Sequence, residues 1–458
     1  MSQPSATQDR LKFSNHEPEQ DGISYEMDTY TRGLSFERPT LTFQSDKWEE
    51  LACARLSADS KGYIYGSAGV GETRDKNRAA FKKWSIQPRR LVKNDTNTGF
   101  PDLTTSLFGE KLSAPIALAP VGVLKIFNAS GEEAAARAAA AQAVPYILST
   151  ASSTSIEDVA RANGSGRQRW YQLYWPSRAH DAITISLLQR AQKAGFTTLF
   201  VTLDTYILGW RPSDLDNGYN PFLHADRTGV ELGLTDPVFR QSFKERHGRE
   251  VEENMADAAK EWMKIVFPGE SHTWEDIGFL KEHWKGAIVL KGIQTVQDAT
   301  RAVQAGVQGI VVSNHGGRQV DGGMSSLGVL PYIVDAVRDC IASSSSTSPS
   351  SMATSDADNN NGKNDFKILF DSGIQSGADI AKALALGADA VLIGRPYVYG
   401  LALGGQGGVE HVLKSLRGEL QLTLHLSGIS GVGKDILNRS CLVREEGLFE
   451  GVRGVGLQ

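Results

Sequence analysis

A histidine and an arginine that could act together follow a short apolar run in the second half of the chain. Residues 309–312 lead directly into Ser313, Asn314, His315, Gly316, Gly317 and Arg318. A histidine can accept a proton near neutral pH, and an arginine three positions later can hold a carboxylate through paired hydrogen bonds. A structural histidine beside a surface arginine is the alternative, but the two intervening glycines let the backbone approach a ligand closely. The segment therefore indicates a general base beside an anion-binding side chain.

Further polar side chains stand at the ends of other apolar runs. Asp204 ends one run and could pair with a protonated His315, and Arg211 in the following loop could bind the same anion. Tyr174 and Lys291 end two more runs. Each has an ordinary structural alternative: a helix cap or loop ion pair for Asp204, core packing for Tyr174, an ion pair for Lys291. If the runs are strands of one barrel, their ends converge on a single site.

Two glycine-containing loops could bind a phosphate group. The first runs from Asp371 to Gly377 after one apolar run, and the second is Gly394-Arg395-Pro396 after the next. Backbone N–H groups and helix N-termini in the loops after the last two strands of a barrel are a common phosphate site. Tight turns would explain either loop alone but explain both together less well. We therefore expect a phosphorylated cofactor.

The elements that would position these residues begin near residue 115. Apolar runs at 115–120, 145–150, 170–175, 198–204, 287–292, 309–314, 367–373 and 390–396 alternate with amphipathic stretches rich in Ala and Leu. Continuous apolar strands covered by helices indicate a parallel sheet that is buried on both faces. Eight such alternations predict a (β/α)8 barrel, the TIM-barrel fold of the α/β class. An open doubly wound sheet is the alternative, but no GxGxxG motif follows the first strand.

Two insertions and two tails surround this repeat. Residues 205–286 follow the fourth strand at the face where barrels keep their active sites, so we expect a lid-like segment there. Residues 343–365 are a low-complexity loop at the opposite face. We predict a polar N-terminal tail or arm over residues 1–45, the barrel domain over 46–430 and a C-terminal tail over 431–458.

Composition excludes several classes of protein. The chain has 458 residues, of which 40% are hydrophobic and 22% charged, so it can bury a large core. Its 48 Lys and Arg against 53 Asp and Glu give a net charge of −5, so we expect no nucleic acid and no membrane as partner. Three scattered cysteines suit neither a disulfide framework nor a zinc site, and no metal is expected. Without an apolar targeting segment, we predict a cytoplasmic protein.

Several motifs resemble those of a known enzyme family. The segments SNHGGRQ, DSGI and IGRP are similar to those of the FMN-dependent α-hydroxy-acid oxidising family, and the similarity runs from about Trp48 to Gly428. Within that family, LDTYILGWRPSDLDNGYNPFL and TWEDI look most like lactate 2-monooxygenase. The resemblance implies an oxidoreductase with FMN as cofactor, a small L-2-hydroxy acid and O2 as substrates, and a homo-oligomeric, tetrameric assembly.

The resemblance also implies a role for individual residues. His315 would be the catalytic base, Asp204 its charge partner and Tyr174 a neighbour of the substrate hydroxyl. Tyr63, Arg211 and Arg318 would bind the substrate carboxylate. The residues implied for cofactor binding are Pro120, Val121, Gly122, Ser149, Gln172, Thr202, Lys291, Ser313, Asp371, Gly373, Gly394 and Arg395.

The sequence departs from the family pattern in the loop at residues 65–69 and at Gln375. Gln375 stands where the family usually has an arginine beside the cofactor phosphate. A lost charge-assisted hydrogen bond costs about 1.5–3 kcal/mol, or roughly ten- to a hundredfold in affinity. We therefore expect FMN retention to depend on Arg395.

Three readings of the function stay open at this point: a monooxygenase, a simple oxidase and a barrel that binds ligands without turnover. In a monooxygenase the 2-keto acid stays bound and is decarboxylated to the shorter acid, CO2 and water. In a simple oxidase the 2-keto acid and H2O2 are released. Electron transfer to a haem partner is disfavoured because no haem-attachment motif precedes the barrel. A barrel that binds ligands without turnover is the third reading, motivated by Gln375 and opposed by the intact set of His315, Asp204, Arg211 and Arg318.

Overall fold

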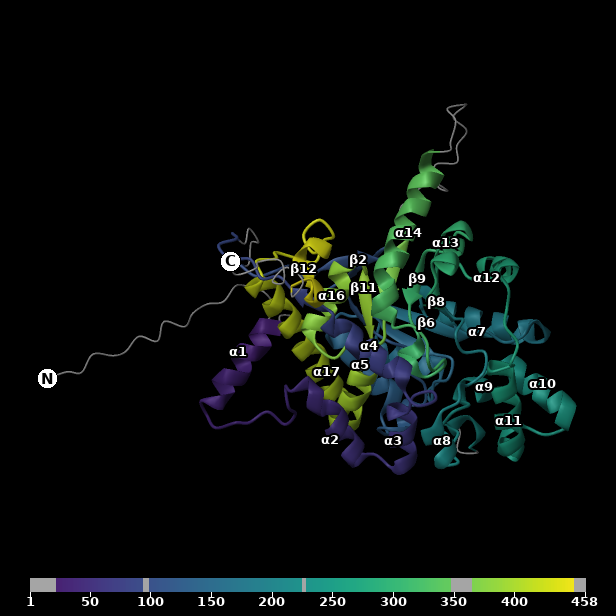
Figure 1. The fold of residues 1–458 in the computed structure, drawn as a ribbon. Helices are drawn as coiled ribbons and strands as arrows, with labels where there is room; N and C mark the ends of the chain where they lie inside the picture. The colour runs from purple at the N-terminus through teal and green to yellow at the C-terminus, as the bar shows by residue number, and fades with distance from the viewer. Residues whose placement is uncertain (1–21, 94–98, 225–227, 347–364, 449–458) are drawn as a thin grey trace.

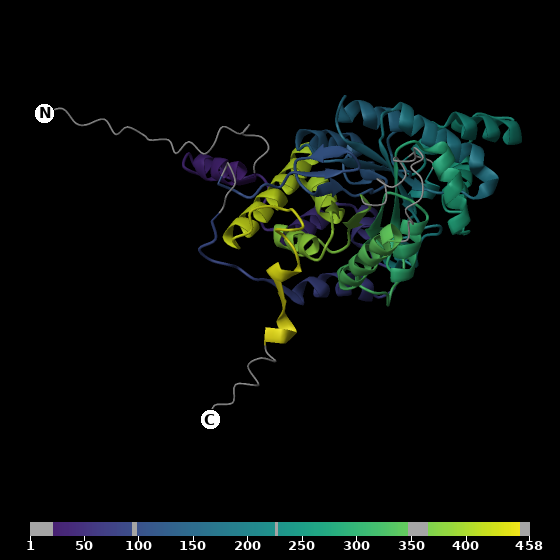
Figure 2. The same ribbon diagram turned by 90° about the horizontal axis from the view of Figure 1, so that it is seen from above.

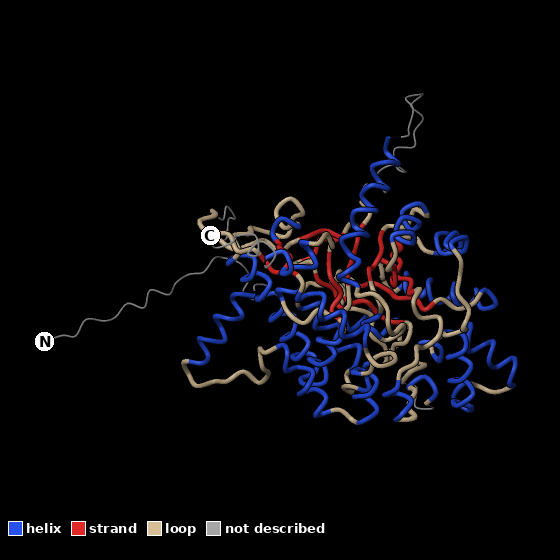
Figure 3. The backbone as a smooth tube through the Cα atoms, in the orientation of Figure 1, coloured by secondary structure: helices blue, strands red, loops and turns tan. Residues whose placement is uncertain are grey.

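The computed structural model describes residues 22–93, 99–224, 228–346 and 365–448. Eight parallel strands in this part of the chain form a closed barrel. They are β4 (Ile116–Leu118), β5 (Tyr146–Ser149), β6 (Arg169–Tyr174), β7 (Thr198–Thr202), β8 (Ala287–Ile293), β9 (Gly309–Val312), β10 (Lys367–Phe370) and β11 (Ala390–Ile393). The strands follow one another around the barrel in chain order, and β11 closes it by pairing with β4, Val391 facing Ile116. The predicted (β/α)8 barrel is confirmed, and Figures 1 and 3 show its strands enclosed by helices.

The barrel interior is filled by large apolar side chains. Trp170 of β6 and Phe200 of β7 stack inside it with their ring centroids 5.4 Å apart. Alternate residues of each strand point outward, so Ile116 and Leu118 pack against the helices while Ala117 faces the interior. A hairpin of β2 (Thr105–Leu107) and β3 (Glu110–Leu112) adds two leucines to the interior cluster. The barrel is thus a packed core, and the space for a ligand lies at its rim.

Amphipathic helices cover the barrel. They are α5 (Gly131–Ala141), α6 (Ile156–Asn163), α7 (Asp181–Lys193), α13 (Val296–Gln304), α14 (Ser326–Ser346), α16 (Gly377–Ala385) and α17 (Arg395–Leu426). Ser155, Thr295 and Ser376 cap α6, α13 and α16 by accepting a backbone N–H of the first turn. The last helix, α17, begins directly after β11 at Arg395 and bends at Gly405, where φ is +58°.

The insertion after β7 forms a helical layer over the C-terminal ends of the strands, as predicted. Residues 205–286 contain α8 (Pro212–Asp216), α9 (Glu231–Leu234), α10 (Pro237–His247), α11 (Met255–Val266) and α12 (Ile277–His283). In Figure 1, α8 to α11 lie at one end of the molecule and α14 projects from the other. Of the predicted low-complexity loop, residues 347–364 lie outside the described residues. The described part of the chain holds no helix long and apolar enough to span a membrane.

Both predicted tails contain structure that packs on the barrel. Helix α1 (Gly22–Gly33) lies along α17 (Figure 2), where Ile23 is buried and the Tyr25 hydroxyl is 2.8 Å from Nδ1 of His411. Strand β12 (Leu442–Arg444) pairs with β1 (Trp84–Ile86) in an antiparallel ladder. Residues 431–448 therefore differ from the predicted C-terminal tail, because Leu437 and Leu442 are buried against the main core. Three helices, α2 (Trp48–Arg55), α3 (Ala58–Tyr65) and α4 (Glu72–Lys82), precede β1.

Candidate active site

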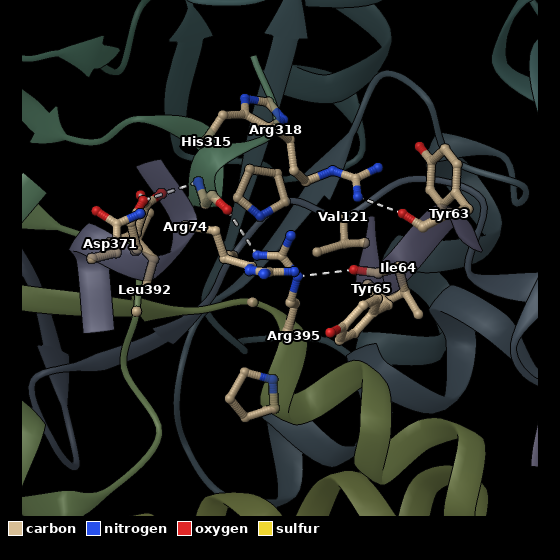
Figure 4. A pocket seen from close by; sticks show the side chains of 18 of the residues that line it. Tyr63, Ile64, Tyr65, Arg74, Val121, His315, Arg318, Asp371, Leu392 and Arg395 are labelled. Carbon is tan, nitrogen blue, oxygen red and sulfur yellow. Dashed lines mark hydrogen bonds between the residues drawn. The ribbon is translucent and has the colours of Figure 1, made fainter. Parts of the chain in front are cut away.

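A cavity of about 360 Å³ opens at the C-terminal ends of the strands. Its walls come from α3, α4, the loops after several strands and the insertion after β7 (Figure 4). Of the predicted site residues, it is lined by Tyr63, Pro120, Val121, Gly122, Tyr174, Arg211, Lys291, His315, Arg318, Asp371, Gly373, Gly394 and Arg395. The structure thus brings together residues spread over most of the chain.

Four of the predicted cofactor-binding residues do not line this cavity. Ser149, Gln172, Thr202 and Ser313 are buried at the strand ends and bond to one another or to Lys291. The Gln172 side chain accepts from the Ser149 hydroxyl at 2.9 Å and donates to the Thr202 hydroxyl at 2.9 Å. Here they form a polar layer next to the cavity.

His315 and Asp204 form a close pair at the cavity. Nδ1 of His315 lies 2.9 Å from Oδ1 of Asp204, and the Thr205 hydroxyl donates to the same oxygen at 2.9 Å. An ionised carboxylate can only accept, so Nδ1 carries the hydrogen and Nε2 carries the lone pair. His315 has a φ of +57°, an uncommon backbone conformation for a residue with a side chain. The pair therefore presents Nε2 as a proton acceptor held by strained backbone.

Burial and charge favour this protonation pattern. Burial lowers the pKa of His315 and outweighs the opposing effect of Asp204, so the imidazole is neutral near pH 7. Burial alone would raise the pKa of Asp204, but the positive charge of Lys291 and the hydrogen bonds from His315 and Thr205 outweigh it and hold the pKa well below its usual range. A neutral base beside a fixed negative charge suits proton abstraction, because the charge stabilises the imidazolium that forms.

This pair predicts the pH dependence of the reaction. Only neutral His315 can accept a proton, and its pKa is lowered from 6.5. We expect kcat/KM to stay constant above pH 6.5 and to fall as the pH decreases through the lowered pKa. In the Asp204→Asn variant the carboxylate that raises the pKa of His315 is lost, so the fall moves to lower pH. Stopped-flow reduction between about pH 5 and 8 checks this, and a fall above pH 6.5 contradicts it.

Two arginines beside His315 have no carboxylate partner among the described residues. Arg211 is 4% exposed and donates to the Arg318 carbonyl at 3.1 Å and to the Gln319 side chain at 2.8 Å. Arg318 donates to the carbonyls of Tyr63 and Gly66 and lies over the Tyr63 ring, 4.9 Å from its centroid. Burial, with the charge of Arg318, lowers the pKa of Arg211 to about 10, so it remains charged at neutral pH. A buried and a half-buried guanidinium, neither of them ion-paired with a carboxylate of the described residues, favour an anionic ligand.

The loops after β10 and β11 form another part of the cavity wall. Lys291 lies 3.5 Å from Asp371, and burial, which would lower its pKa, is outweighed by Asp371 and Asp204, so the pKa is raised. Ser372, after β10, donates to Asp371 at 2.7 Å and accepts at 3.0 Å from the N–H of Gly316, in the loop after β9. Arg395 donates to carbonyls of Ile64, Gly66 and Gly316 at 2.8–3.0 Å (Figure 4). This part of the wall therefore combines the backbone of two loops, the N-terminus of α17 and the cationic side chains of Lys291 and Arg395, which suits an anionic group.

Several residues of the site were not predicted from the sequence. Thr205 fixes the His315–Asp204 pair, and Gln319 bonds Arg211. Gln319 directly follows Arg318 in the SNHGGRQ motif, so its position was a usable signal. The remaining lining residues that were not predicted include Arg74, Asn77 and Arg78 of α4 and Leu208, Phe222 and Phe267 of the insertion. Helix α4 precedes the barrel strands, so the rule that active-site residues follow the C-terminal ends of the strands does not predict its position.

Comparison with known proteins agrees with this geometry. The sequence profile of the FMN-dependent dehydrogenases matches residues 52–443. An FMN-dependent alpha-hydroxy acid dehydrogenase of Schizosaccharomyces pombe is 59% identical over 424 residues, 93% of this chain and 97% of that protein. An L-lactate oxidase of Lysinibacillus sphaericus is 38% identical over 405 residues, 87% of this chain and 92% of that protein. A crystal structure of mandelate oxidase superposes with a TM-score of 0.68 at 31% identity, covering 86% of this chain and 96% of the other. The chain belongs to the FMN-dependent dehydrogenase family, and its cofactor is FMN.

Proposed function

We propose that this FMN-dependent α-hydroxy acid oxidising enzyme acts on a lactate-like L-2-hydroxy acid with O2 and decarboxylates the 2-keto acid before releasing it. The observation that carries the proposal is the placement of the His315–Asp204 pair beside two uncompensated arginines in one cavity. A 2-hydroxy acid offers the two groups that this arrangement suits, a carboxylate for Arg211 and Arg318 and a hydroxyl for His315.

The residues at the cavity fit FMN. Arg395 is a half-buried guanidinium whose hydrogen-bond partners among the described residues are all carbonyls, and burial lowers its pKa to about 10, so a phosphate would supply a close negative charge. A Cβ on Gly122 would lie 2.7 Å from the Ala151 Cβ, so only glycine fits this stretch of the cavity wall. Pro120, Val121 and Lys291 would hold the ring system, and Gly373, Gly394 and Arg395 the phosphate end.

The chain's own residues account for substrate binding and proton transfer. Bound FMN supplies a two-electron acceptor. Arg211 and Arg318 hold the carboxylate, which places the substrate hydroxyl near Nε2 of His315. His315 takes a proton and Asp204 stabilises the resulting imidazolium. Burial raises the pKa of Tyr174, so its phenol stays protonated and donates a hydrogen bond to the substrate oxygen.

The insertion supports retention of the 2-keto acid. It contributes Leu208, Arg211, Phe222 and Phe267 to the cavity wall and so covers the substrate end. A retained 2-keto acid reacts with H2O2 to give the shorter acid, CO2 and water. The relative named an L-lactate oxidase favours the second candidate, in which 2-keto acid and H2O2 are both released.

Product analysis separates the two candidates. We expect anaerobic L-lactate to bleach the flavin absorbance of the purified protein. After O2 is admitted, acetate and CO2 are expected under the proposal, and pyruvate with H2O2 under the alternative. Catalase in the assay is the control, because it removes released H2O2 and leaves a reaction inside the cavity unchanged. A flavin that lactate does not bleach contradicts the proposed substrate.

An apolar wall next to the arginines predicts the substrate size. Phe267 lies 5.1 Å from the rings of both Tyr174 and Phe222, measured between centroids. These rings limit the space for the substituent at C2. We expect Phe267→Ala to raise kcat/KM for an aromatic 2-hydroxy acid such as mandelate relative to lactate by roughly tenfold. Phe279→Ala, also in the insertion but outside the cavity wall, is the matched control. An unchanged ratio contradicts the assignment.

A further inference from the structure

The cofactor end of the cavity contains more positive charge than the loops after β10 and β11 supply. Those loops contribute one arginine, Arg395, together with the neutral side chain of Gln375. Helix α4 crosses this end and adds Arg74 and Arg78 to the lining. The two α4 arginines differ in what already binds them, and that difference decides which of them is available to a ligand.

Arg78 is already paired with a buried carboxylate. Its Nη1 donates to Oδ2 of Asp379 at 2.7 Å and also to the Gly373 carbonyl. The Asp379 side chain is 7% exposed and additionally accepts from the Gln375 backbone N–H. A buried carboxylate of this kind needs its counter-charge, so Arg78 holds the loop after β10 in place.

Among the described residues, the one carboxylate paired with Arg74 lies at the surface, and the Arg74 guanidinium lies over the Tyr65 ring, 5.3 Å from the centroid. Nε of Arg74 bonds Asp75 at 3.0 Å, and the Asp75 side chain is 69% exposed. An exposed pair between adjacent residues contributes little and does not neutralise the guanidinium. The backbone passes close to Arg74 at Gly71 and Gly317. A Cβ on Gly71 would lie 3.1 Å from Nη2 of Arg74, and a Cβ on Gly317 would lie 2.6 Å from its backbone nitrogen. Neither Nη1 nor Nη2 of Arg74 has a hydrogen-bond partner among the described residues, so both can bond a ligand.

Arg74 and Arg395 act on each other across the cavity. Figure 4 shows both side chains directed into it. Burial, together with the charges of Arg318 and Arg74, lowers the pKa of Arg395 to about 10 against the opposing effects of Tyr399 and Glu49. The like charges of the two arginines repel each other. An anion bound between them attracts both, and this attraction outweighs the repulsion. A phosphate monoester carries about 1.5 to 2 negative charges near pH 7 and bonds several donors.

We propose that Arg74 of α4 binds the FMN phosphate together with Arg395 and supplies the positive charge that Gln375 does not supply. The phosphate is then held from two sides, by the start of α17 and by a helix that precedes the barrel. This makes α4 part of the cofactor site as well as of the scaffold.

The test compares FMN with riboflavin, which has the same ring and ribityl chain but no phosphate. The full-length protein is freed of flavin, and binding is followed by the loss of flavin fluorescence. We expect Arg74→Gln to weaken FMN binding roughly ten- to a hundredfold and to leave riboflavin binding unchanged. The FMN affinity of the wild type should also fall more steeply with salt than that of the variant.

Three further variants make the result specific. Lys76→Gln removes a cation from α4 that does not line the cavity, and it should bind FMN like the wild type. Arg74→Lys should retain most of the affinity, and Arg74→Gln combined with Gln375→Arg should recover it. Equal weakening of FMN and riboflavin would assign Arg74 a structural role and overturn the proposal. An unchanged FMN affinity, or a double variant as weak as Arg74→Gln, would also overturn it.

Discussion

Replacement of His315 by glutamine is expected to leave FMN bound and to slow anaerobic reduction of the flavin by substrate about 10²–10⁴-fold. The imidazole contributes the only lone pair of the His315–Asp204 pair that faces the cavity, since Nδ1 is held by Asp204 at 2.9 Å. Glutamine is of similar size and can bond Asp204, but it does not accept a proton near neutral pH. FMN content is measured by absorbance, and the reduction rate by stopped-flow mixing without O2.

The controls for this prediction use the partner residue and a distant histidine. Asp204→Asn should lower the rate by less than His315→Gln, because the base remains while the charge that stabilises its protonated form is lost. His411→Gln changes a buried histidine on α17 that is far from the cavity lining, and it should reduce at the wild-type rate. Full bleaching of the His315→Gln protein at the wild-type rate would refute the assigned base.

Replacement of Arg211 by methionine is expected to lower kcat/KM on the order of 10²–10³-fold. Truncation of one partner of a buried, hydrogen-bonded charge pair costs about 2–5 kcal/mol. Arg211 is almost fully buried and its guanidinium has no carboxylate partner among the described residues, so a bound substrate would be its main counter-charge. Steady-state kinetics with L-lactate gives the size of the loss.

A neutral substrate analogue shows whether the loss depends on charge. The wild type should prefer lactate strongly over lactamide, and Arg211→Met should lose most of that preference. Arg240→Met removes an arginine of the same insertion that is paired with Glu252 at the surface, so its kinetics should not change. An equal loss for acid and amide in Arg211→Met would show that Arg211 only supports the fold.

Much of the fold was predictable because the physical signals are local. The strands from β4 to β11 are apolar on both faces, and each is followed by an amphipathic helix or, after β7, by the insertion. Once the barrel is inferred, chain order alone places the residues after each strand at one rim. His315, Asp204, Arg211 and Arg318 come together for that reason, although more than 100 positions separate His315 from Asp204.

The rest depends on packing between distant segments, for which the sequence carries no short-range signal. Strand β12 was predicted as part of a tail because three residues have no detectable period, and it is stabilised by pairing with β1. Arg74 was not predicted because the position of α4 depends on contacts with the loop after β9. Ser149 and Gln172 stand at the predicted strand ends, yet they bond each other instead of lining the cavity.

The pairing of β11 with β4 has a consequence for the order in which the protein matures. The barrel closes only when Val391 meets Ile116, and α4, on another side of the cavity, is synthesised before either. A ribosome adds residues from the N-terminus, and contacts between distant segments form only when both have been made. One wall of the FMN site is therefore translated early and another late. The FMN site is thus complete only after β11 and the loop that follows it have been made.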